Sequence, residues 1–180
     1  MDRVLSLLPV AVGVAAIASV VALAVFLVIR GPFGTVNDLL NAVLAVLSAV
    51  LAWRLSGLGP LTYVAFMGAV IALVGSALVI SETTGFFLAG LVSSLGFSLI
   101  GLWLLAYAWS MGDGVLRWLG LAAGALMTLG VLVIPGIVMR LDDMDKAPAW
   151  IWVGFVSWLG IYVAYPAWAI WSGLTNQPLR

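Results

Sequence analysis

The sequence predicts an all-α fold, that of a polytopic membrane protein built as a six-transmembrane-helix bundle. The 180-residue chain is 65% hydrophobic and only 8% charged, whereas soluble domains carry about 25% charged residues. Six long apolar runs make up most of the chain, and only short polar segments separate them. A helix needs about 20 apolar residues to cross the hydrocarbon core of a bilayer, and five of the runs reach that length easily.

The six predicted helices span residues 7–29, 36–53, 61–80, 86–109, 115–139 and 149–171, within a single transmembrane domain of residues 1–180. The first run exceeds the roughly 7–15 apolar residues of a secretion signal, so it predicts a first membrane helix. The second run is the shortest, and it crosses the membrane if it stands upright. Pro135 and Pro166 predict kinks in the last two helices, because proline lacks the N–H of a helical hydrogen bond.

Small residues recur four positions apart in four of the predicted helices. The rows are Ala11/Ala15/Ser19, Gly68/Ala72/Ser76, Gly90/Ser94/Ser98 and Gly120/Gly124/Thr128. Helices in lipid associate through close van der Waals contact, which small residues permit, so we expect a tightly packed bundle. A tryptophan followed by a Ser/Gly turn ends every second helix, at Trp53, Trp109 and Trp171. This recurrence suggests three helical hairpins around an axis normal to the membrane.

The composition excludes several classes of function. The chain has no His and no Cys, which removes thiolate and histidine metal sites as well as Ser-His-Asp and Cys-His catalysis. No catalytic constellation is visible, so we expect no enzyme activity, no metal and no cofactor. The formal net charge is zero, so nucleic acid is not an expected partner.

The richest polar cluster lies on the second predicted helix. Asn37 and Asn41 are four residues apart and Ser48 follows seven later, which places all three on one helical face. An amide inside the membrane must find hydrogen-bond partners, either at a helix interface or along a pathway for a solute. An interface is the commoner use. The alternative is a polar pocket that opens toward the more acidic side of the membrane.

Two further groups are candidates for a site. Trp158, Tyr162 and Tyr165 give the last helix an aromatic lining that can contact a ligand, although such residues more often fill a core or face lipid. Asp38, Glu82 and Arg140 fall at one membrane level, at helix ends, where they can form a gate or an ion site.

The alternative for the charged group is ordinary loop solvation, with Arg140 pairing Asp142 or Asp143 in water. We expect no acidic or basic side chain in the middle of a span, which argues against an ion-coupled pump.

Six crossings place both termini on one side of the membrane. Four basic residues belong to that side, namely Arg3, Arg54, Arg117 and Arg180. Three belong to the other side, namely Arg30, Arg140 and Lys146. Cytoplasmic loops favour Lys and Arg, so we expect both termini in the cytoplasm. The compact chain favours a multi-pass protein of a bacterial cell membrane.

These observations favour a non-enzymatic integral membrane protein. It is either an accessory or scaffold subunit, or a binder of lipid or another apolar ligand. The alternative is a channel or facilitator for a small neutral solute that uses the Asn37/Asn41/Ser48 face. The expected partners are membrane lipids, together with other membrane subunits or further copies of the chain in a homo-oligomer.

Overall fold

A computed structural model describes residues 3–175, with side chains from residue 7 onward. Every regular element in this range is helical. Six helical segments are long and apolar enough to cross a membrane. The predicted six-helix bundle is confirmed, and the protein is a multi-pass membrane protein by length and composition of its helices.

The first four spans are single helices: α1 (Arg3–Ile29), α2 (Phe33–Ser56), α3 (Pro60–Ile80) and α4 (Phe86–Trp109). The fifth span consists of α5 (Val115–Thr128), the 3₁₀ turn η1 (Leu129–Val133) and α6 (Ile134–Val138). A loop with the 3₁₀ turn η2 (Met144–Lys146) leads to the sixth span. The sixth span consists of α7 (Ile151–Phe155), α8 (Ser157–Leu159), the π-helical turn η3 (Gly160–Ala164) and α9 (Tyr165–Thr175).

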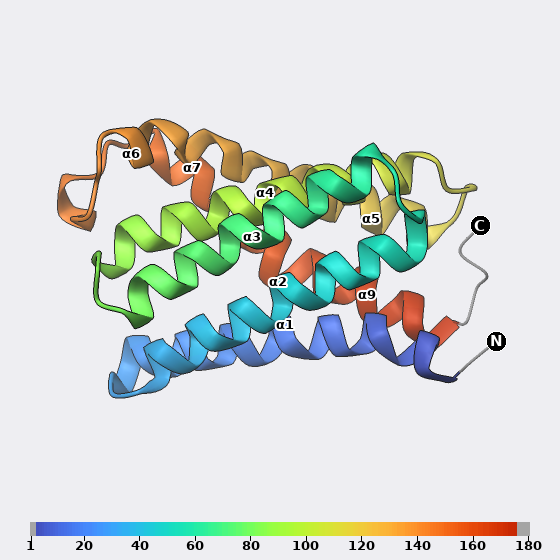
Figure 1. Cartoon of the computed structure of the whole chain (residues 1–180), viewed down its shortest axis with the longest axis horizontal. Helices are drawn as coiled ribbons and strands as arrows, with labels where there is room; N and C mark the ends of the chain where they lie inside the picture. Colours follow the sequence, from blue (N-terminus) through green and yellow to red (C-terminus); the bar gives the residue numbers. More distant parts are fainter. Residues whose placement is uncertain (1–2, 176–180) are drawn as a thin grey trace.

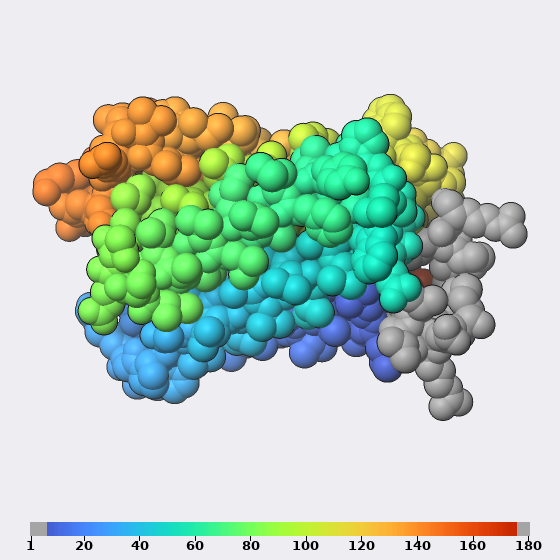
Figure 2. Space-filling model, in the orientation of Figure 1, coloured from blue at the N-terminus to red at the C-terminus, as the bar shows by residue number. Residues whose placement is uncertain are grey.

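The spans form a closed ring in chain order. Each helix packs against the next one, and the sixth span closes the ring by packing against both α1 and α5. Helix α1 begins and α9 ends at one end of the bundle, which we call the terminal end (Figure 1). The connections from α1 to α2, from α3 to α4 and from α6 to α7 lie at the opposite end, the loop end (Figure 1). Figure 2 shows α2 and α3 in direct contact along one face.

Helix α2 begins three residues before the predicted start. Arg30 and Gly31 adopt positive φ angles of 61° and 73° and reverse the chain. Pro32 follows as the N-cap with a φ of −73°, the angle at which proline suits entry into a helix. As a result Asp38, predicted at a helix end, lies more than one turn inside α2 and is only 6% exposed.

Glycines allow α3 and α4 to touch through their backbones. A Cβ added at Gly68 would lie 2.5 Å from the carbonyl oxygen of Gly96, and one added at Gly96 would lie 2.6 Å from that of Gly68. The predicted small-residue face of α3 is therefore a contact surface. Gly90 behaves differently, because a Cβ there would meet nothing within 4 Å.

Both predicted kinks coincide with local changes of helix type. Before Pro135 the fifth span tightens into η1. Before Pro166 the sixth span widens into η3. A proline ring clashes with the carbonyl four residues earlier, here that of Tyr162, and a π turn moves that carbonyl away. The wider turn also changes the direction in which Ile161 and Tyr162 project.

Candidate functional site

A polar cavity lies between α1, α2, α4 and the sixth span, toward the loop end. Half of its lining residues are polar: Asn37, Asp38, Asn41, Ser93, Ser94 and Tyr162. The others are Leu23, Phe86, Gly90, Phe97, Trp158 and Ile161. The volume is about 30 Å³, which is room for a water molecule or for the tip of a ligand.

One wall is a hydrogen-bond network that joins three spans. The Asn37 side-chain amide donates to the Ser19 carbonyl and hydroxyl oxygens at 2.9 and 2.8 Å. The Asn41 amide donates to Asn37 Oδ1 at 3.2 Å. Asn41 Oδ1 accepts from the Ser19 hydroxyl at 2.8 Å and from the Tyr162 hydroxyl at 3.1 Å. Each bond has its donor and acceptor in place, so this wall is rigid.

Asp38 is the exception on this wall. Its Oδ2 atom is buried and has no hydrogen-bond partner among the described residues. The two salt bridges in the described part of the chain use other carboxylates, those of Asp113 and Asp143. A buried carboxylate without a partner costs free energy, and an ionisable side chain inside a membrane span is the usual mark of a functional site. The sequence expectation that acids stay at helix ends is corrected at this residue.

Aromatic side chains form a second part of the lining. Trp158 donates its indole N–H to Ser94 Oγ at 3.0 Å, which ties the sixth span to α4. The Trp158 ring packs edge-on against Tyr162, with centroids 6.3 Å apart, and against Phe155 at 4.7 Å. Phe86 pairs with Phe26 of α1 at 5.9 Å, near the loop end. The cavity therefore has a polar face and an aromatic face.

The π turn sets the position of the tyrosine on the polar face. Ile161 and Tyr162 belong to η3, and both line the cavity. Single π turns inside α-helices occur frequently at functional sites because they redirect side chains without breaking the helix. Here the turn brings the Tyr162 hydroxyl to Asn41, a residue 121 positions earlier in the chain.

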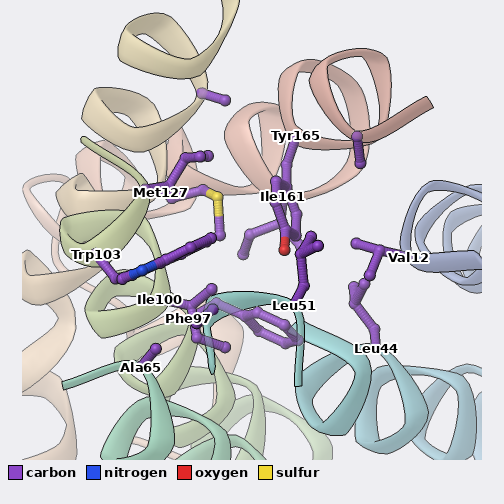
Figure 3. Packing of buried hydrophobic residues seen from close by; sticks show 14 of the residues in the cluster. Val12, Leu44, Leu51, Ala65, Phe97, Ile100, Trp103, Met127, Ile161 and Tyr165 are labelled. Atoms are coloured by element: carbon purple, nitrogen blue, oxygen red, sulfur yellow. The ribbon is translucent and has the colours of Figure 1, made fainter. Parts of the chain in front are cut away.

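A packed apolar cluster fills the bundle deeper in. Phe97, Ile100, Trp103 and Met127 belong to it, and each is at most 2% exposed. Figure 3 shows these side chains projecting between the helices, with Leu44 of the same cluster beside Val12 of α1. In this cluster Tyr165 donates to Ser48 Oγ at 3.0 Å, and Ser48 donates to the Leu44 carbonyl at 2.7 Å. The polar cavity has no polar continuation through these residues.

The structure brings together most of the predicted site residues. Asn37, Asn41, Trp158 and Tyr162 line the cavity with Asp38. Ser48 and Tyr165 pair with each other in the apolar cluster and do not line it.

The predicted group of Asp38, Glu82 and Arg140 is separated. Glu82 and Arg140 are exposed, with φ angles of 53° and 52° in the turns that follow α3 and α6. Neither residue lines the cavity.

The predicted pairs of Arg140 with Asp142 or Asp143 do not occur. Asp142 instead accepts hydrogen bonds from the backbone N–H groups of Gly85 at 2.6 Å and Leu88 at 3.2 Å, and so caps α4. Asp143 pairs with Lys146 at 2.9 Å. The hydrogen bond from Lys146 lowers the pKa of Asp143, and the same contact raises the pKa of Lys146.

Ser19, Ser94 and Gly90 are site residues that sequence reasoning assigned only to packing. Each belonged to a predicted small-residue row, which signals close packing but not a cavity. Phe86 and Phe97 carried no signal, because phenylalanine is common in any membrane helix. In residues 3–175, no three His, Cys, Asp or Glu side chains come together in a way that could hold a metal ion.

Comparison of the chain with protein-family models, with curated proteins and with solved structures found no match.

Proposed function

We propose that this protein is a non-enzymatic membrane protein that binds the polar end of a lipid or of another amphiphilic ligand. The supporting observation is the mixed lining of the cavity, which combines amides and a carboxylate with aromatic rings. Ligand sites are typically mostly apolar, with a few polar groups that orient the ligand. A pure scaffold subunit needs no buried carboxylate without a partner, so the cavity favours binding.

The position of the cavity supports an amphiphile as the ligand. Phe86 and Gly90 belong to the first turns of α4, so the cavity lies near the loop end. Trp150 and Trp152 begin the sixth span at that end and are exposed. Indole rings prefer the interface between hydrocarbon and headgroups. A ligand can place a polar tip in the cavity and leave its apolar part among the helices or the lipid.

No enzymatic step is part of the proposal. The chain has no His and no Cys, and the described residues contain no group of three His, Cys, Asp or Glu side chains that could hold a metal ion. The basic residues of the terminal end favour a cytoplasmic position for that end of the bundle. We therefore place the cavity toward the opposite leaflet of a cell membrane. Selective labelling of single cysteines introduced at positions 58 and 144 tests this orientation.

The binding proposal is tested by filling the cavity. Gly90→Leu adds a side chain where no atom lies within 4 Å of the new Cβ. Ala125→Leu introduces the same leucine side chain on an exposed face of α5 and serves as the control. We expect native mass spectrometry to find lipid retained by the wild type and the control, and depleted in Gly90→Leu. Equal retention by all three proteins contradicts the proposal.

A facilitator for a small neutral solute is the second candidate. One observation favours it: the polar row on α2 continues past the cavity to Ser48. The Ser48–Tyr165 hydrogen bond and the apolar cluster close that route in this conformation. Liposome flux assays distinguish the two functions. Solute entry that Asn41→Leu abolishes supports a facilitator, whereas retained lipid without flux supports a binding protein.

A further inference from the structure

We propose that the cavity selects a primary ammonium group, held by the Asp38 carboxylate against the aromatic wall. This inference rests on the proposed binding function and deepens it by naming the chemistry of the ligand's polar tip. The ammonium can belong to a lipid headgroup or to a free alkylamine, because both present the same group.

The charge of the Asp38 carboxylate favours a cationic ligand. Asp38 is 6% exposed, and its Oδ2 atom has no partner among the described residues. Arg30, Arg140 and Lys146, the basic residues of the loop end, are all exposed and do not line the cavity. A buried carboxylate needs a counter-charge or a set of donors to offset its lost hydration. A cationic ligand supplies both.

The hydrogen-bond acceptors of the cavity lining favour an ammonium group. An ammonium group has three N–H donors and no acceptor. Asp38 provides carboxylate oxygens, and Asn37 Oδ1 accepts only the bond from Asn41, which leaves one lone pair. Trp158 and Tyr162 also line the cavity, and aromatic rings attract cations electrostatically. The lining therefore suits a cation with several short donors.

The lining also favours an ammonium group over other ligand types. A volume of about 30 Å³ admits a group close to water in size, as a primary ammonium is. A trimethylammonium group has no N–H donor to give to the Asp38 and Asn37 oxygens. A divalent metal ion prefers several oxygen ligands, with more than one carboxylate in the tighter sites, and Asp38 is the only carboxylate in the lining. The cavity thus discriminates by charge and by the number of hydrogen-bond donors.

The experiment uses the full chain, delipidated in a neutral detergent. Thermal unfolding is followed as the protein is titrated with phosphatidylethanolamine, with its mono-, di- and trimethylated forms of the same acyl chains, and with ethylamine. We expect stabilisation to fall with each added methyl group and to vanish for phosphatidylcholine. Stabilisation by ethylamine alone identifies a free amine as sufficient, whereas stabilisation by the lipid alone identifies a headgroup. Equal stabilisation by all the lipids overturns the inference.

Two variants locate the effect at Asp38. Asp38→Asn keeps the side-chain shape and removes the charge. We expect its affinity for phosphatidylethanolamine to fall by on the order of 100-fold, so that the preference for the primary amine disappears. Glu82→Gln removes an exposed carboxylate at the same end and is expected to behave as the wild type. A preference that survives in Asp38→Asn contradicts the inference. The methylation series on the wild type decides the question even if that variant fails to fold.

The two proposals fail differently. If phosphatidylethanolamine and phosphatidylcholine bind equally, and Gly90→Leu abolishes both, the cavity binds lipid but does not select an ammonium group. If Gly90→Leu changes the binding of neither lipid, the cavity is not the binding site and both proposals fall.

Discussion

Helix α4 has a glycine on each of two faces, and the two glycines have different effects. One allows a close helix contact and the other leaves open space. Toward α3, Gly96 and Gly68 let the backbones touch, and any Cβ would strike main-chain atoms. Toward α2, Gly90 faces the cavity, and a Cβ would meet nothing within 4 Å. Small residues permit two helices to approach closely, but a contact forms only where a neighbouring helix lies against them. At Gly90 no neighbouring helix comes this close, and the residue lines the cavity instead.

The largest expected effect comes from breaking the tight face. Gly96→Leu drives a side chain into the Ala72 backbone, whose Cα would lie 2.8 Å from the new Cβ. Backbone cannot move aside as a side chain can, so we expect a loss of about 3 kcal/mol or more of unfolding free energy. Denaturant unfolding in detergent micelles measures it. Gly90→Leu is the matched change on the open face, and a similar loss there refutes the contrast.

Breaking the polar wall is the next largest. Asn41→Leu removes the acceptor of the Ser19 and Tyr162 hydroxyls and the donor to Asn37 Oδ1, although Ser19 still accepts from the Asn37 amide. We expect a loss of about 1–3 kcal/mol, as for other buried polar groups left unpaired. Ser98→Ala, which removes only a bond to the Leu95 carbonyl in the same helix, is the control. A stability equal to that of the control shows that the wall does not hold α2 in place.

The start of α4 is held by a cap from a distant loop. Asp142→Ala removes the acceptor of the Gly85 and Leu88 N–H groups. We expect a cost of about 1 kcal/mol, together with faster hydrogen exchange at residues 85–88. Because Phe86 and Gly90 line the cavity, ligand retention also weakens. Unchanged exchange at these amides contradicts the role of the cap.

Filling the open face gently is expected to stabilise the protein. Gly90→Ala reduces the conformational entropy that the chain loses on folding, which stabilises a helix by about 0.5–1 kcal/mol. The new Cβ meets no atom within 4 Å, so no clash opposes this gain. The same substitution reduces the cavity. A raised unfolding temperature with weaker ligand retention is the expected outcome. Destabilisation by Gly90→Ala shows that the space is filled by protein atoms.

The smallest effect belongs to the exposed Asp143–Lys146 pair, which lies outside both faces. Because the folded-state pKa of Asp143 is lowered, its contribution exists above the unfolded-state pKa and disappears as the pH falls through the folded value. The raised pKa of Lys146 removes the contribution again as the pH rises through that value. Lys146→Ala is expected to leave unfolding unchanged within error at neutral pH. A clear loss of stability contradicts this.

Much of the site was visible in the sequence as separate pieces. Asn37 and Asn41 were predicted to share one face of a helix, and Trp158 and Tyr162 were predicted to line another. Their meeting depends on η3, since Pro166 forces a wider turn that redirects Tyr162. Ser48 and Tyr165 were predicted on the same faces and met each other deeper in the bundle. Residue spacing along one helix predicts which side chains share a face. It does not predict which residue of another helix lies opposite them, or how deep in the bundle.

The amino-acid sequence alone determined the surrounding solvent, the number of spans and the helical fold. Hydrocarbon forces every backbone polar group to be satisfied within a helix, so composition and run length suffice for these conclusions. Only the tertiary structure decided that Asp38 is buried, with no partner for its Oδ2 atom among residues 3–175, while Glu82 and Arg140 stay exposed. It also decided which glycines became contacts and which one opened a cavity. These outcomes depend on distances between helices, and no pattern within one helix encodes them.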